Sequence, residues 1–215
     1  MRYQLAKFAL LLPILLLVGC ETIYFNTMEK VGVHKRDILI DRIEETQESQ
    51  EDAQEQFKSA LEQLRSITNF DGGDLEDLYN KLNDEYEGSA EAAKEINNRI
   101  NKVESVGEAL FDEWRDELKQ YTSSKLRNAS ATKLKTTERK YKKLIAVLRK
   151  AERSITPVLN SLKDNSLYLK HNLNARAVAS IKGELKSIDA DISQLIKQMQ
   201  TSISESDAFI AQLKS

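Results

Sequence analysis

Residues 75–121 read LEDLYNKLNDEYEGSAEAAKEINNRINKVESVGEALFDEWRDELKQY, and this stretch decides the fold class. Apolar and small residues recur in it at alternating steps of three and four, the heptad spacing of a helix that packs along one face. A strand would alternate at every second residue instead. The seam runs through Leu75, Tyr79, Leu82, Tyr86, Ser89, Ala93, Ile96, Ile100, Val103, Gly107, Leu110, Trp114, Leu118 and Tyr121. The sequence therefore predicts one long α-helix here.

Three further seams with the same spacing lie on either side of this stretch. One begins with polar residues and runs through Thr46, Gln50, Ala53, Phe57, Ala60, Leu64 and Ile67. Another runs through Leu134, Thr137, Tyr141, Leu144, Leu148, Ala151, Ile155, Val158 and Leu162. The last runs through Val178, Ile181, Leu185, Ile188, Ile192, Leu195, Met199 and Ser202, and it continues near Phe209 and Leu213. Tertiary contacts must hold the first of these helices, because its seam is so polar, and this seam leaves an opening for a second copy of the chain.

Few positions in the chain favour turns, since it contains only two prolines and seven glycines. The clearest turn is 70–74, where Asp74 can cap the next helix. Two further turns are predicted at 122–124 and 172–174, and the three turns separate four helices. The predicted helices span about 23–69, 75–121, 124–171 and 175–213. Four helices of similar length with short connections predict an all-α fold, an elongated antiparallel up-down bundle or coiled coil.

Pro157 lies inside the third predicted helix. Proline removes a backbone donor and crowds the preceding turn, so we expect a kink or a break near Thr156. Alternatively, Ser154 or Thr156 caps a new helix that carries the proline in its first turn. Both alternatives predict that the third helix is not straight.

The first twenty residues have the features of a bacterial lipoprotein signal. Arg2 and Lys7 precede and flank an apolar run at 8–18, which is shorter than the ~20 residues of a typical membrane span. Leu-Val-Gly-Cys at 17–20 is a lipobox, and Cys20 is the only cysteine of the chain. We expect residues 1–19 to be a signal peptide, Cys20 to carry acyl groups such as palmitate, and residues 20–215 to form a single helical-bundle domain. The alternative is a general secretory signal or signal anchor with an incidental cysteine.

This signal predicts a protein of the cell envelope, anchored to a membrane by lipid and facing the periplasm. In lipoproteins that this start resembles, an aspartate after the cysteine retains the protein in the inner membrane. Glu21 occupies that position, which favours the outer membrane. A lone cysteine allows no disulfide within the chain, so packing must supply the stability.

Charge is separated along the sequence. Residues 41–120 carry 23 acidic and 9 basic side chains, whereas residues 121–186 carry 16 basic and 4 acidic ones. One interpretation is mutual neutralisation between the second and third helices, at ~0.2–1 kcal/mol per exposed pair. The other is that part of the basic face meets an anionic surface such as phospholipid, lipopolysaccharide or cell-wall polymer. A nucleic-acid partner is hard to reconcile with an exported lipoprotein. The basic face comprises Lys133, Lys135, Arg139, Lys140, Lys142, Lys143, Arg149 and Lys150.

The sequence contains no recognisable motif for nucleotide binding, metal binding or catalysis. No phosphate-binding Gly-x-x-x-x-Gly-Lys-Ser/Thr run occurs. His34 and His171 are the two histidines, and neither has a second histidine or a cysteine at metal-ligand spacing. We therefore predict no enzyme activity, no metal and no cofactor.

Two polar stretches, 35–37 and 170–172, could form a cluster at one end of the bundle. We expect the third helix to run back toward the membrane, which would bring residues 35–37 and 170–172 together at the membrane-proximal end. The expected cluster comprises Lys35, Arg36, Asp37, Lys170, His171 and Asn172. If these side chains formed a concave pocket, they could make a small-ligand-binding or enzymatic module.

Tyr24 to Ile40 and Leu167 to Ala175 carry a resemblance to a known family. They contain MEKVG at 28–32, KRDIL at 35–39 and LYLKHNLNA at 167–175. The chain resembles an uncharacterised proteobacterial envelope family, domain of unknown function 2959, across nearly the whole mature sequence. The resemblance implies no catalytic residues. The leading hypothesis is a non-enzymatic spacer or adaptor that links the membrane to another envelope protein or an anionic envelope polymer, with the 70–74 turn far from the membrane.

Overall fold

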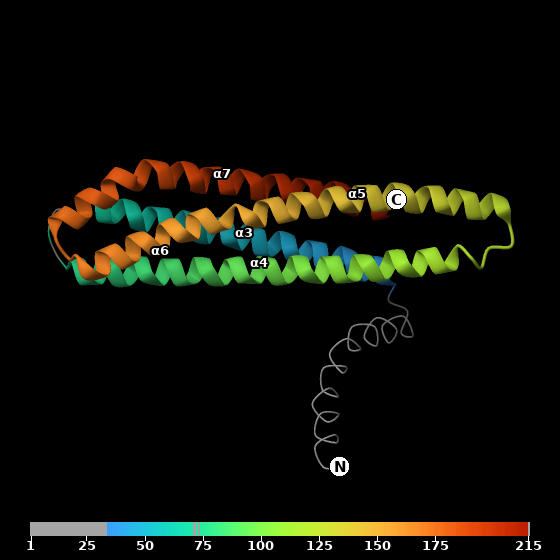
Figure 1. Ribbon diagram of the computed structural model, residues 1–215, viewed down its shortest axis with the longest axis horizontal. Coiled ribbons are helices and arrows are strands. Elements are labelled where there is room, and N and C mark those ends of the chain that lie inside the picture. Colours follow the sequence, from blue (N-terminus) through green and yellow to red (C-terminus); the bar gives the residue numbers. More distant parts are fainter. Residues whose placement is uncertain (1–33, 71, 73, 215) are drawn as a thin grey trace, which may run out of the picture.

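The computed structural model describes residues 34–70, 72 and 74–214, and every regular element in them is an α-helix (Figure 1). The helices are, in chain order, α3 (Lys35–Thr68), α4 (Leu75–Glu117), α5 (Ser124–Arg153), α6 (Ile155–His171) and α7 (Ala175–Lys214). The predicted all-α class is confirmed, and the third predicted helix is divided into α5 and α6.

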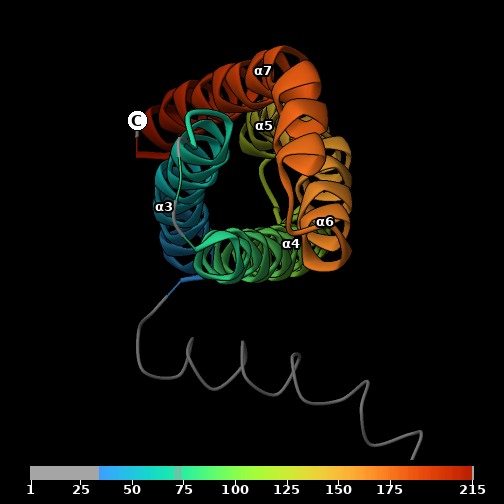
Figure 2. The ribbon, with the colours of Figure 1, turned by 90° about the vertical axis from the view of Figure 1, so that its left-hand side faces the viewer.

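The helices form an elongated antiparallel bundle. Seen along the long axis, α3, α4, α6 and α7 occupy the four corners, with α5 continuing α6 (Figure 2). Because α4 has 43 residues, it is about 65 Å long at 1.5 Å per residue. We call the end at which α3 begins and α7 ends the base, and the end with the α3–α4 and α6–α7 connections the tip.

The buried core follows the predicted seams closely. All seven seam positions between Thr46 and Ile67 are buried, and so are all nine between Leu134 and Leu162. These residues form one continuous hydrophobic core with α4 and α7. Heptad spacing keeps one stripe of each helix turned inward, and removal of this apolar stripe from water supplies the main stabilisation.

The polar seam of α3 is covered within the chain by α7. Gln50 is fully buried, and its Oε1 accepts a hydrogen bond of 2.6 Å from Ser202 Oγ. Thr46 is also buried, and its hydroxyl donates to the Arg42 carbonyl. The Ser202 bond is a tertiary contact of the kind expected for this helix, although the Gln50 Nε2 group is buried without a hydrogen-bond partner among the described residues.

The connections lie at the predicted turns, and Asp74 caps α4 as predicted. Asp74 Oδ1 accepts from the amides of Glu76 and Asp77, and Asn174 Oδ1 accepts from the amides at the start of α7. Ser123 caps α5 through the Leu126 amide. One expectation is wrong: Tyr121 was placed on the core seam, but α4 ends at Glu117 and Tyr121 is 39% exposed.

The third long element breaks beside Pro157 as expected. α5 ends at Arg153, and α6 begins at Ile155 with Pro157 in its first turn, where its missing amide hydrogen costs no helix bond. Ser154 joins the two helices with its amide bonded back to Lys150 and Ala151. Its hydroxyl donates to Ala151 and caps nothing in α6.

Ion pairs link the acidic and basic helices. Arg149 of α5 pairs with Glu104 of α4 at 2.5 Å, and Lys143 of α5 pairs with Glu205 of α7 at 2.8 Å. The opposite combination also occurs, between Arg115 of α4 and Glu138 of α5. These pairs bear out the first interpretation of the charge separation for part of the basic face. The other part has no ion pair within the described residues; it comprises Lys133, Lys135, Arg139, Lys140, Lys142 and Lys150.

No helix within residues 34–214, leaving aside positions 71 and 73, is long and apolar enough to cross a membrane.

Candidate functional site

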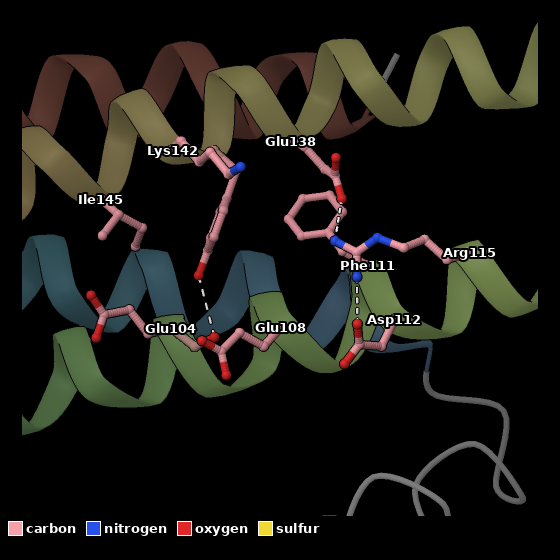
Figure 3. A pocket seen from close by; sticks show the side chains of 9 residues that line it. Glu104, Glu108, Phe111, Asp112, Arg115, Glu138, Lys142 and Ile145 are labelled. Atoms are coloured by element: carbon pink, nitrogen blue, oxygen red, sulfur yellow. Dashed lines mark hydrogen bonds and ion pairs between the residues drawn. The ribbon is translucent and has the colours of Figure 1, made fainter.

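A groove with a volume of about 440 Å³ lies between α4 and α5 (Figure 3). Both helices contribute walls, and the floor is apolar. The lining residues are Glu104, Glu108, Phe111, Asp112, Arg115, Glu138, Tyr141, Lys142 and Ile145. Because the heptad stripes of α4 and α5 turn toward the core, their flanking charged positions rise on either side of the groove.

The groove floor rests on close packing between Tyr141 and Gly107. An added Cβ at Gly107 would collide with the Tyr141 ring, so only glycine permits this approach. The Tyr141 hydroxyl donates to the Val103 carbonyl at 3.1 Å. Its ring meets the edge of Phe111 with 5.1 Å between ring centroids, and Phe209 of α7 lies on its other side at 6.1 Å. One aromatic side chain therefore joins three helices near the base.

The groove walls carry both paired and unpaired charges. Arg115 bridges Asp112 and Glu138, as the dashed lines in Figure 3 show. By contrast, Glu108 on α4 and Lys142 on α5 are exposed and have no ion pair with any described residue. The apolar floor of the groove therefore lies between the unpaired Glu108 carboxylate and the unpaired Lys142 ammonium group. Such a surface suits contact with an amphipathic group.

Burial raises the pKa of the Tyr141 hydroxyl well above its ordinary value, and the carboxylates of Glu104 and Glu108 raise it further. The Arg149 guanidinium opposes this shift. The phenol therefore stays protonated in the folded protein at every physiological pH.

This shift predicts that Tyr141 weakens the fold at alkaline pH. An unfolded tyrosine ionises near pH 10, while the folded phenol keeps its proton, so raising the pH above ~10 favours unfolding by about 1.4 kcal/mol per unit. Tyr141→Phe lacks this effect, so the stability advantage of the wild type over the variant should shrink by about 1.4 kcal/mol between pH 9 and pH 11. Chemical denaturation of both proteins at each pH measures it. A pH-independent difference would contradict the prediction, because all other titrating groups are common to both proteins.

No group of three or more histidine, cysteine, aspartate or glutamate side chains in the described part of the chain has the geometry to hold a metal ion. The groove also contains no histidine, cysteine or serine that could act as a nucleophile.

The predicted cluster of residues 35–37 with 170–172 does not form. Lys35 is at the base, where its Nζ lies 3.1 Å from Glu113 Oε1 near the end of α4. Residues 170–172 are at the tip, since Ser166 Oγ lies 3.3 Å from Asn83 Oδ1 near the start of α4. About 45 Å of α4 separates the two contacts at 1.5 Å per residue.

The expected direction of the third helix was wrong. Two short connections reverse the chain twice, so α5 and α6 run from base to tip, parallel to α3 (Figure 1). His34 and His171 consequently lie at opposite ends. Arg36 pairs with its neighbour Asp37 at 3.2 Å, while Lys170 and His171 are exposed. Cys20, the predicted lipidation site, lies outside the described residues.

Exposed large apolar side chains mark both ends of the bundle. Leu167, Tyr168 and Leu173 are exposed at the tip, and Tyr121 and Leu126 are exposed at the base. A hollow of about 390 Å³ adjoins Tyr168 between α6 and α7. Within residues 34–70, 72 and 74–214, no other large apolar side chain is exposed, so the exposed ones lie at the two ends of the bundle.

Sequence reasoning missed these surfaces, although a signal for them exists. Leu126, Leu167 and Tyr168 lie between the heptad positions, where an apolar residue cannot face the core.

The described residues thus define an elongated helical bundle with a groove between α4 and α5, a hollow between α6 and α7, and exposed apolar side chains at both ends. The chain belongs to the DUF2959 family, described as a protein of unknown function, whose model matches residues 24–213. The resemblance to domain of unknown function 2959 is confirmed. Comparisons with curated proteins and with solved structures gave no match.

Proposed function

We propose that this protein is a lipid-anchored, periplasm-facing bundle that acts as a non-enzymatic spacer or adaptor in the cell envelope. The observation that carries the proposal is the placement of the exposed apolar side chains, which lie at the two ends and not along the sides. Exposed apolar groups that gather in one place indicate contact with another surface. End-on contacts are what a spacer requires.

The direction of the bundle supports the same proposal. Cys20 precedes α3, and α3 begins at the base, so a lipid on Cys20 would hold the base near the membrane. The tip would then reach about 65 Å farther into the periplasm, the length of α4. Outer-membrane location, favoured by Glu21, stays part of the proposal.

The tip is the end proposed to contact another envelope protein. Leu173 lies in the α6–α7 connection, and Leu167 and Tyr168 lie in the last two turns of α6. Between them and around them are exposed polar groups such as Lys170 and His171. An apolar centre with a polar rim is the usual composition of a protein-binding surface.

Photo-crosslinking in intact cells tests the adaptor proposal. A photoreactive amino acid at Tyr168 or Leu173 should give an adduct with a specific envelope protein, because these side chains would lie in the contact. Ala190, exposed on the side of α7, is the matched control and should give none. Absence of an adduct from both tip positions would count against the adaptor.

An anionic envelope polymer is the second candidate partner. Its support is the unpaired part of the basic face on α5, described above. Ala146 is exposed on α5 among these basic residues. In the same experiment, adducts to a non-protein polymer from Ala146 and none from the tip would favour this partner over a protein.

A further inference from the structure

The α4–α5 hairpin extends beyond the rest of the bundle at the base (Figure 1). Phe209 of α7 packs against Tyr141, and α7 ends at Lys214, so the first turns of α5 have no α7 beside them. These turns, from Ser124 to about residue 134, reach about 15 Å past the end of α7 at 1.5 Å per residue. Trp114 Nε1 of α4 donates a hydrogen bond of 2.8 Å to Ser130 Oγ of α5, which connects the two helices of the hairpin.

The end of this hairpin combines apolar and basic side chains. Leu126 is 58% exposed, the most exposed large apolar residue described, and Tyr121 in the α4–α5 connection is 39% exposed. Residues 118–137 contain five basic and no acidic side chains. Lys125 and Arg127 have no ion pair with any described residue, whereas the Asp116 carboxylate of the other arm is already paired with Lys119. Glu117 is the one carboxylate of the last α4 turn left without an ion pair.

We propose that the hairpin end, residues 118–127, rests on the anionic phospholipid surface of the membrane that carries the anchor. A tyrosine and a leucine flanked by Lys125 and Arg127 match a bilayer interface, where amphipathic rings and apolar side chains enter the headgroup region and basic groups meet phosphate.

The position of the chain start agrees with a lipid surface as the occupant. This inference rests on the anchoring part of the proposed function. Residues 21–33, which connect Cys20 to the base, can span at most about 45 Å when fully extended. The hairpin projects from the same end by about 15 Å, so the tether is long enough for its end to reach the bilayer. With two supports, a tether and a hairpin, the bundle would be held at a fixed angle to the membrane.

A single tryptophan placed at the hairpin end tests the contact. The mature chain with Trp114→Phe and Leu126→Trp is coupled through the Cys20 thiol to a maleimide lipid in phosphatidylethanolamine and phosphatidylglycerol vesicles with brominated acyl chains. Emission from position 126 should move to shorter wavelength and be quenched on coupling. The control carries Trp114→Phe and Leu173→Trp, and its emission at the tip should not change. Unchanged emission from position 126 would overturn the proposal.

Charge dependence distinguishes anionic lipid from a merely apolar contact. Adding Lys125→Gln and Arg127→Gln to the coupled chain should weaken the contact of the hairpin end with the vesicle surface by about fivefold per residue, because each basic side chain near an anionic surface contributes about that factor. The same quenching in this variant would overturn the anionic part of the proposal.

A second measurement covers the case in which Trp114→Phe does not fold. A photoreactive amino acid at position 126 in the otherwise unchanged chain should form adducts with phospholipid in cells, and adducts with protein alone would overturn the proposal. The chemical linkage at Cys20 makes the vesicle result independent of natural lipidation. Failure of acyl labelling in cells would therefore contradict the proposed anchoring and leave the hairpin measurement interpretable.

Discussion

Gly107→Ala should lower the free energy of unfolding by about 2 kcal/mol, because the new methyl group collides with the Tyr141 ring. Tyr141 would have to move away, losing its hydrogen bond to the Val103 carbonyl and its contacts with Phe111 and Phe209. Alanine improves helix propensity by about 1 kcal/mol, but overpacking of a buried ring and the lost hydrogen bond together exceed this gain. Thermal and chemical denaturation measure the change.

Gly183→Ala is the matched control. Gly183 also lies within a long helix, α7, but an added Cβ there would meet no atom within 4 Å. This substitution should stabilise the protein by about 0.5–1 kcal/mol through helix propensity alone. In a Tyr141→Leu background, Gly107→Ala should lose most of its penalty. If the Gly107→Ala protein were as stable as the wild type, the packing of the Tyr141 ring would not require glycine at position 107.

Cys20→Ser should move the protein from the membrane fraction to the soluble fraction. Each buried methylene of an acyl chain contributes ~0.8 kcal/mol to membrane attachment, and stable anchoring takes more than one chain. The substitution removes the sulfur that the first chain requires, so we expect the membrane-bound share to fall by more than about tenfold. Labelling with an acyl precursor measures acylation, and fractionation of cells measures the membrane-bound share.

Gln50→Met serves as a control for damage to the fold, since it changes a buried residue of α3 and keeps its volume. Its membrane fraction should equal that of the wild type. Retained acyl labelling of the Cys20→Ser protein would refute the predicted lipidation site.

The pattern of the sequence determined the class of fold and most of the core. Heptad spacing identified buried positions as polar as Gln50 and Ser89, because the step of three and four is a property of each helix by itself. Asp74 predicted a helix start for the same reason, since a cap acts on amides only two or three residues away. Pro157 likewise predicted a break whose cause is confined to one turn.

The arrangement of the two ends depended on the tertiary structure. Lys35 and His171 each had a plausible partner in the sequence, but the number of chain reversals places them at opposite ends of the bundle. Tyr121 followed the heptad spacing and is nevertheless exposed, because α4 ends at Glu117 and the helical spacing does not continue to that position.

The local sequence therefore determined which residues form helices, which face turns inward and where the helices stop. The tertiary structure alone decided that Gly107 seats the Tyr141 ring, that a groove opens between α4 and α5, and that the hairpin with Leu126 projects from the base. The physical reason is range: helix spacing and caps act over a few residues, whereas relative helix length and offset emerge from packing summed along the whole bundle.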